Sequence, residues 1–123
     1  MQRKFRLTHS EDFKRVRRSG KSYAHPLVVL IVQTHDRRSN PADQPHVKIG
    51  VAAGRTVGTA VHRNRAKRLV REAIRTLIPN IASGFDLILI ARPALVSATL
   101  EETRQALYTL LQRAQILTPL NES

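Results

Sequence analysis

RTVGTAVHRNRAKRLVREAIRTLI, residues 55–78, is the stretch around which the rest of this chain is arranged. Gly58 and Thr59 are typical of the start of a helix, and Pro79 marks its end. Between them, apolar residues recur with the i, i+3, i+4 spacing of one helix face: Ala66, Leu69, Val70, Ala73, Ile74, Leu77 and Ile78. The stretch therefore predicts a long amphipathic helix.

The polar side of this predicted helix carries almost only positive charge. Seven basic residues lie between Arg55 and Arg75, and Glu72 is the only acid among them. Helical geometry places these residues opposite or beside the apolar stripe: Asn64, Arg65, Lys67, Arg68, Arg71 and Arg75. Arg63 projects past the end of the core. A solvated face normally mixes charge signs, because opposite charges four residues apart support a helix. We therefore expect a polyanion to bind this face.

Composition narrows the class of protein. The 123 residues suffice for one domain, which we place at 1–118 with a tail at 119–123. The net charge of +12 indicates nucleic acid or an anionic membrane surface, but the predicted helix lacks the apolar aromatic residues of a membrane-surface helix. No apolar signal core or spanning segment is present, so we expect a cytoplasmic protein with no membrane partner. Without cysteine there is no disulfide framework.

The residues before the central helix predict one helix and two strands. Residues 1–7 form a basic arm that we expect to be mobile. THSE, residues 8–11, predicts a capping box for a helix that ends near Ser19, with Gly20 as its stop. Residues 27–34 and 47–53 are rich in β-branched residues, and a polar loop at 35–46 joins them, which suggests an antiparallel pair. Gly50 within the second strand indicates a bulge or a close approach to the backbone.

The residues after the central helix predict one strand and one helix. FDLILIAR, residues 85–92, is an unbroken apolar run that suits a strand covered on both faces. Pro93 ends this strand, and TLEE at 99–102 is a second capping box that opens the last helix. The order predicts an α+β sandwich in which helices pack on a small sheet. If one sheet face stays open, it borders a basic groove between the first helix and the start of the central helix.

The chain offers no pattern of self-contained catalysis. Its nine acids are scattered, its five histidines show no metal-ligand spacing, and no phosphate-binding glycine loop is present. We therefore predict a binding protein with no catalytic residue of its own and leave metal binding open.

Several segments resemble one known family. AVHRNRAKRLVREAIR, residues 60–75, resembles the RNR signature of the bacterial ribonuclease P protein component. EDFKRV at 11–16, VGTAV at 57–61 and FDLILIARP at 85–93 are similar to its first helix, its approach to the signature and its late strand. The resemblance implies a two-layer αβββαβα sandwich with a left-handed β-α-β crossover, an exception to the right-handed rule. This fold class is shared with a domain of a ribosomal protein.

The resemblance also implies a function. The chain would be the protein subunit of an endoribonuclease that removes the 5′ leader of precursor tRNA. The catalytic centre would lie in the RNA subunit, which holds Mg²⁺, and the expected partners are that RNA, in a 1:1 complex, and precursor tRNA.

The family's binding residues carry over to two groups of positions. The catalytic RNA would contact Arg63, Asn64, Arg65, Lys67, Arg68 and Arg71. The leader would contact Phe13, Arg17, Arg55 and Thr56. Arg55 and Thr56 stand where the family commonly has two lysines, and Arg17 stands where it often has a second aromatic. Phe13 can serve as a core anchor or as a stacking platform.

Two other classes stay open on the residues alone. A ribosomal or other structural RNA-binding protein would share the charge without a role in tRNA processing. A DNA reader would need short polar side chains along the helix, and Asn64 is followed almost only by Arg and Lys, so this class ranks last.

Overall fold

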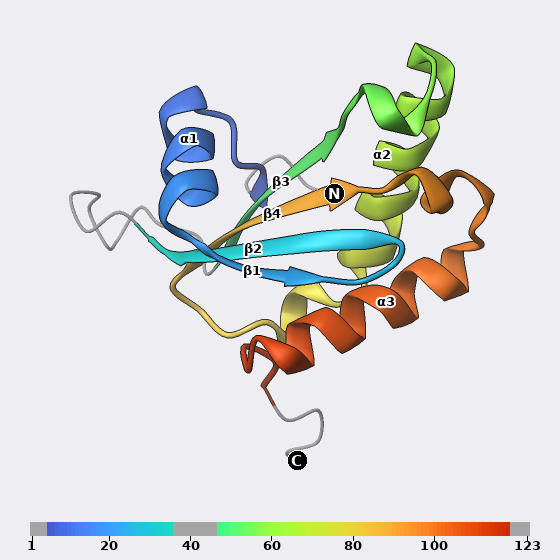
Figure 1. The fold of residues 1–123 in the computed structure, drawn as a ribbon. Helices are drawn as coiled ribbons and strands as arrows, with labels where there is room; N and C mark the ends of the chain where they lie inside the picture. Colours follow the sequence, from blue (N-terminus) through green and yellow to red (C-terminus); the bar gives the residue numbers. More distant parts are fainter. Residues whose placement is uncertain (1–4, 36–46, 119–123) are drawn as a thin grey trace.

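The computed structural model describes residues 5–35 and 47–118 (Figure 1). In this part of the chain, four strands form one sheet and three helices pack on its two faces. The elements in chain order are α1 (Ser10–Ser19), β1 (Lys21–Ala24), β2 (Val28–Thr34), β3 (Val47–Ala53), η3 (Arg55–Val57), α2 (Ala60–Arg75), η4 (Ile78–Asn80), β4 (Phe85–Ala91), η5 (Pro93–Ser97) and α3 (Leu100–Arg113). This order confirms the α+β class and the αβββαβα arrangement.

The sheet has the strand order β1-β2-β4-β3. β2 pairs antiparallel with both β1 and β4, whereas β3 pairs parallel with β4. The predicted antiparallel pair of residues 27–34 with 47–53 is therefore wrong, because β4 lies between those two strands. Leu87, Ile88 and Leu89 of β4 are fully buried. An unbroken apolar run buries most surface in a central strand, because both faces of that strand are covered. β3, α2 and β4 form a crossover between adjacent parallel strands, whose left hand stays a prediction.

β1 was not expected from the residues themselves, although the family resemblance implied it. The strand is short, lies at the edge of the sheet, and only Tyr23 of its four side chains is half-buried. An exposed edge strand carries no alternating apolar pattern, so no periodicity marks it.

The two faces of the sheet differ in how much they bury. α2 and α3 pack on one face over the main core, which includes Leu30, Ile49, Ile74 and Leu107. α1 packs on the other face over a small cluster of Leu7, Val16, Ile31 and Ile88, with Phe13, Val29 and Ile90 at its margin. The predicted two-layer body is thus formed by the sheet with α2 and α3, and α1 covers only part of the opposite face.

α2 begins where the sequence places its start and ends before Pro79. Thr59 is the N-cap, and its hydroxyl oxygen accepts a hydrogen bond from the His62 N–H at 3.4 Å. The helix ends at Arg75, and the residues around Pro79 form the short η4 turn. Pro79 has no backbone N–H to donate to the Arg75 carbonyl, so the α-helical hydrogen-bond pattern cannot continue through it.

α1 begins later than predicted, and the expected capping box at residues 8–11 is wrong. His9 is the N-cap, and no side chain caps this helix. Leu7 is buried, and its N–H donates to the Ile49 carbonyl at 2.9 Å, which keeps the chain extended up to the helix. The same contact corrects the expectation of a mobile arm for residues 5–7. Residues 1–4 of that arm, the loop from 36 and the tail at 119–123 lie outside the described residues.

α3 begins with the predicted capping box. The Thr99 hydroxyl oxygen accepts from the Glu102 N–H at 3.0 Å, and the Glu102 carboxylate accepts from the Thr99 N–H at 2.9 Å. Pro93 ends β4 as predicted and starts the η5 turn.

Candidate nucleic-acid interface

α2 presents cations that have no partner among the described residues. Arg65 and Arg68 are exposed, and Arg63, Lys67 and Arg71 are half-buried. Among the described residues, none of these five side chains forms an ion pair or a hydrogen bond. On α2 the acid Glu72 pairs only with Arg75, at 2.6 Å, near the end of the helix. The N-terminal three turns therefore hold positive charge that the described protein does not neutralise.

Arg63 and Arg71 also carry buried donors. The Nε atom of each side chain is buried and has no hydrogen-bond partner among the described residues. A buried donor without an acceptor is costly, and a phosphate oxygen is a strong acceptor for a guanidinium. Both Nε atoms are covered in this conformation, so a phosphate could reach them only if the side chain moves.

Asn64 is exposed, and no hydrogen bond among the described residues involves its amide. Asparagine is a poor helix residue because its side chain competes with the backbone for hydrogen bonds. No contact within the described protein explains its presence, so the amide is available to a partner.

The face of the sheet that carries α1 is covered unevenly. Strand register aligns three rows across β2, β4 and β3: Gln33, Asp86, Lys48; then Ile31, Ile88, Gly50; then Val29, Ile90, Ala52. α1 packs over the second row, where Val16 meets Ile31 and Ile88. The third row is only half-buried, so it forms an apolar strip beside α1. We call Val29, Ile90 and Ala52 the open strip.

Phe13 lies on α1 directly over Gly50. A Cβ atom at Gly50 would overlap the Phe13 ring, so glycine is required for this approach. This contact confirms the close backbone approach predicted at Gly50. The ring packs at the margin of the small cluster and stays half-buried, so part of it faces outward.

The four predicted leader-binding residues lie at two borders of the open strip. Phe13 and Arg17 belong to α1, and Arg17 is exposed. Arg55 and Thr56 are exposed in η3, which follows β3 just beyond the row that contains Ala52. Figure 1 shows α1 near the start of β3 and η3 beyond its end. The fold thus places the strip between two sets of residues that are 38 or more positions apart in sequence.

Sequence reasoning anticipated an open sheet face but missed the residues of the open strip and one charged contact. The strip could not be recognised because its members come from three strands whose order was not known. The other missed residue is Asp86, a carboxylate within the apolar run FDLILIA. A charge in a buried strand is a signal in itself, because buried charges need partners.

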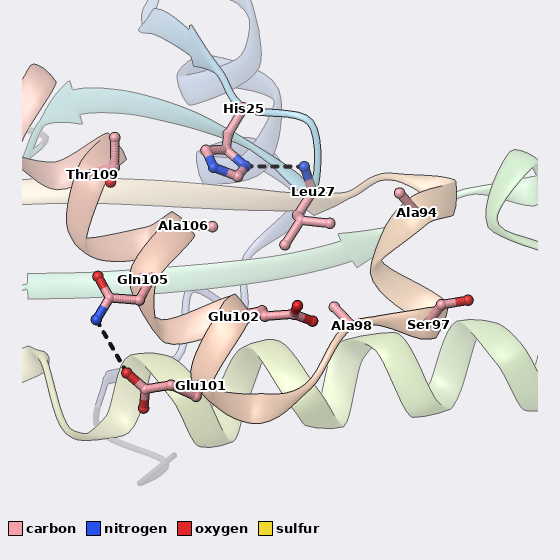
Figure 2. A pocket seen from close by; sticks show the side chains of 10 residues that line it. All are labelled: His25, Leu27, Ala94, Ser97, Ala98, Glu101, Glu102, Gln105, Ala106 and Thr109. Atoms are coloured by element: carbon pink, nitrogen blue, oxygen red, sulfur yellow. Dashed lines mark hydrogen bonds between the residues drawn. The ribbon is translucent and has the colours of Figure 1, made fainter.

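One hollow of the described surface lies away from the basic residues. A pocket of about 460 Å³ is bordered by α3, η5 and the β1–β2 turn (Figure 2). Glu101 and Glu102 lie at its rim, and both carboxylates already accept hydrogen bonds, Glu101 from Arg104 and Gln105 and Glu102 from the Thr99 N–H. This acidic rim is unsuited to a polyanion, in contrast to the cations of α2.

Within the described residues, no three His, Cys, Asp or Glu side chains are grouped closely enough to hold a metal ion. None of the described helices is long and apolar enough to cross a bilayer.

A basic helix whose cations have no partner among the described residues, beside an open apolar strip on a sheet, is typical of an α+β nucleic-acid-binding protein. A sequence model of the ribonuclease P family matches residues 1–115, so the chain belongs to the ribonuclease P protein family. The ribonuclease P protein component of Herpetosiphon aurantiacus is 43% identical over 116 residues, which cover 94% of this chain and 89% of the relative.

Solved structures agree with the sequence comparison. The ribonuclease P protein of Staphylococcus aureus superposes with a TM-score of 0.76 at 25% identity, covering 93% of this chain and 98% of that one. The protein from Thermotoga maritima gives a TM-score of 0.73 at 28% identity, covering 88% and 96%. The chain is thus a protein component of ribonuclease P that acts in tRNA processing, and an RNA subunit is its partner.

Proposed function

We propose that this chain supports removal of the 5′ leader from precursor tRNA by holding two RNAs at once. The face of α2 formed by Arg63, Asn64, Arg65, Lys67, Arg68 and Arg71 binds the RNA subunit in a 1:1 complex. The open strip, bordered by Phe13, Arg17, Arg55 and Thr56, binds the single-stranded leader. Bond cleavage belongs to the RNA subunit and its Mg²⁺ ions.

The observation that carries this proposal is the set of unpaired cations on α2. A helix face with five cations and no described partner costs self-repulsion that a phosphate backbone relieves. Arginine and lysine can neutralise phosphates without reading bases, which suits a folded RNA recognised by its shape.

The open strip suits an unpaired strand because it combines an apolar floor with cations at its borders. Single-stranded RNA binds where bases stack on apolar or aromatic groups and phosphates meet positive charge. The half-exposed Phe13 ring and the Arg17 guanidinium provide such surfaces beside Val29, Ile90 and Ala52.

Reconstitution tests the overall role. We expect the purified chain, mixed with bacterial ribonuclease P RNA at low magnesium concentration, to restore cleavage of precursor tRNA. The chain alone should leave the precursor intact. Cleavage by the protein alone, or no effect on the RNA subunit, would contradict the proposal.

Leader binding is tested by comparing precursor with mature tRNA. Arg17→Ala and Arg55→Ala should reduce the affinity of the reconstituted complex for precursor tRNA while leaving its affinity for mature tRNA unchanged. Phe13→Ala separates two roles, because loss of melting temperature indicates a core anchor and loss of precursor affinity alone indicates a stacking platform. Equal losses of affinity for precursor and mature tRNA would contradict the assignment of leader binding to this site.

A further inference from the structure

Asp86 is a buried carboxylate in a strand that is otherwise apolar. Its exposed fraction is 3%, and it lies at the start of β4 between Phe85 and Leu87. Burying an isolated carboxylate is very costly, so such a group persists only where cations and hydrogen-bond donors satisfy it.

Three segments meet at the Asp86 carboxylate. Its Oδ2 atom accepts a hydrogen bond from Arg15 Nη2 of α1, and its Oδ1 atom lies 2.7 Å from His35 Nδ1 just after β2. Arg15 Nη1 also donates to the Thr34 carbonyl oxygen at 2.9 Å, and Asp12 Oδ1 lies 3.4 Å from Arg15 Nη2. Burial lowers the pKa of Arg15, but its hydrogen bonds and charge contacts with Asp86 and Asp12 outweigh this and raise it, so the guanidinium stays charged.

α1 contacts the sheet through few side chains. Val16 is its only fully buried side chain, and the half-buried Phe13 ring lies over Gly50. At about 100° per residue, these two contacts lie at the centre and on one flank of the helix. The bonds from Arg15 to Asp86 and to the Thr34 carbonyl hold the opposite flank, so they resist rotation of α1 about its own axis.

The orientation of α1 decides which side chains border the open strip. At about 100° per residue, Arg15 and Arg17 lie on opposite flanks of the helix, with Val16 between them facing the sheet. Arg15 is held at the row of Gln33, Asp86 and Lys48, on one side of the row that α1 covers. The flank with Phe13 and Arg17 is therefore turned toward the opposite side, where the strip lies.

We propose that Asp86 is a positioning residue for leader binding, which acts through Arg15 to hold the Phe13 and Arg17 flank of α1 beside the open strip. The inference rests on the proposed leader site. Asp86 itself touches no RNA, and the α2 face is on a different element, so the effect is confined to the leader.

The test uses the complex reconstituted with ribonuclease P RNA. Asp86→Asn keeps the shape of the side chain but removes its charge. We expect the preference of the complex for precursor over mature tRNA to fall roughly tenfold, as for a coupled neighbouring pair. Affinity of the protein for the RNA subunit should be unchanged. Glu101→Gln, which removes a carboxylate from α3 far from this contact, is the matched control and should leave the preference intact.

A double variant keeps the test valid if a single charge left buried harms folding. Arg15→Ala with Asp86→Asn removes both charges, so no unpaired buried ion remains. If Asp86 acts through Arg15, the double variant loses no more preference than Asp86→Asn alone. A loss in the double variant equal to the sum of the losses of Arg15→Ala and Asp86→Asn would contradict that route. Arg15→Lys should retain part of the preference that Arg15→Ala loses, because lysine keeps the charge and lacks only the planar fork of the guanidinium.

The outcomes separate this inference from the leader site itself. If Arg17→Ala lowers precursor preference and the double variant does not, Asp86 has no positioning role and the leader site stands. If Arg17→Ala itself has no effect on preference, the leader site fails. Equal loss of affinity for precursor, mature tRNA and the RNA subunit in the Asp86 variants would show a general structural role and overturn the inference.

Discussion

α2 and α3 pack side by side on the same face of the sheet, yet their charged side chains differ in whether they have partners within the described protein. Both are amphipathic and bury a full apolar stripe, with Ile74 and Leu107 fully covered. α3 uses its charges within the protein: Glu101 pairs with Arg104 at 2.7 Å, and Arg113 donates to the Ala24 carbonyl at 2.8 Å.

The charges of α2 are left over by comparison. Apart from the pair of Glu72 with Arg75, its cations meet no partner among the described residues. The apolar stripes explain why both helices fold onto the sheet, and only the unpaired charge distinguishes α2, the helix proposed to bind the RNA subunit. In the proposed function, stability and RNA binding are thus carried by opposite faces of one helix.

The largest expected effect tests whether the two apolar stripes are equivalent. Ile74→Ala in α2 and Leu107→Ala in α3 should each lower the free energy of unfolding by about 2–5 kcal/mol, through lost burial and a residual cavity. Denaturant unfolding followed by circular dichroism measures this. A loss confined to one helix would show that the main core does not depend on both.

The next effect concerns the charges. Arg65→Ala with Arg68→Ala should weaken binding to the RNA subunit and reduce the slope of affinity against salt concentration by about one per lost phosphate contact. Arg104→Ala with Arg113→Ala in α3 is the matched control and should leave that slope unchanged. Filter binding over a range of salt concentrations gives both slopes. Equal changes in the two helices would remove the distinction between them.

A smaller effect separates the two helix starts. Thr99→Ala should cost about 1 kcal/mol of stability, because it breaks a reciprocal capping box. Thr59→Ala should cost less, since its single capping bond is long at 3.4 Å. Thermal unfolding compares the two variants. A larger loss at Thr59 would show that the start of α2 is held more tightly than its geometry indicates.

The smallest effect concerns the one ion pair of α2. The hydrogen bond from Arg75 is the main cause that lowers the pKa of Glu72 below its usual value. A lowered carboxyl pKa contributes stability above the unfolded pKa, and this is lost as pH falls through the folded value. Glu72→Gln should therefore lower the melting temperature slightly at neutral pH and leave it unchanged in strong acid. A larger effect in acid would contradict the sign of this shift.

Much of the fold was predictable because its signals are local. Helix periodicity, the TLEE capping box and the apolar run at 85–92 each depend on residues within a few turns of one another, and all three predictions were confirmed. The capping box at residues 8–11 failed because a distant contact, Leu7 with the Ile49 carbonyl, holds the chain extended there. A local capping preference is overridden where a tertiary hydrogen bond fixes the same stretch of backbone.

The candidate site likewise has one part that local sequence signals predicted and one part that they did not. The cations of α2 lie on one helix, most of them opposite or beside its apolar stripe, so their grouping followed from spacing alone. The open strip and the Arg15–Asp86 contact depend on strand order and on residues 71 positions apart, which no periodicity reveals. Asp86 was nevertheless marked in the sequence as a charge within an apolar strand.

The amino-acid order thus defines the elements and the charge each one carries, since helix formation and amphipathicity need only neighbours along the chain. The tertiary structure alone decides that β4 separates β2 from β3, that α1 covers one row of the sheet and leaves the next half-open, and that Asp86 meets Arg15. Those features depend on which surfaces remain to be buried once every element has formed, and burial is a property of the whole molecule.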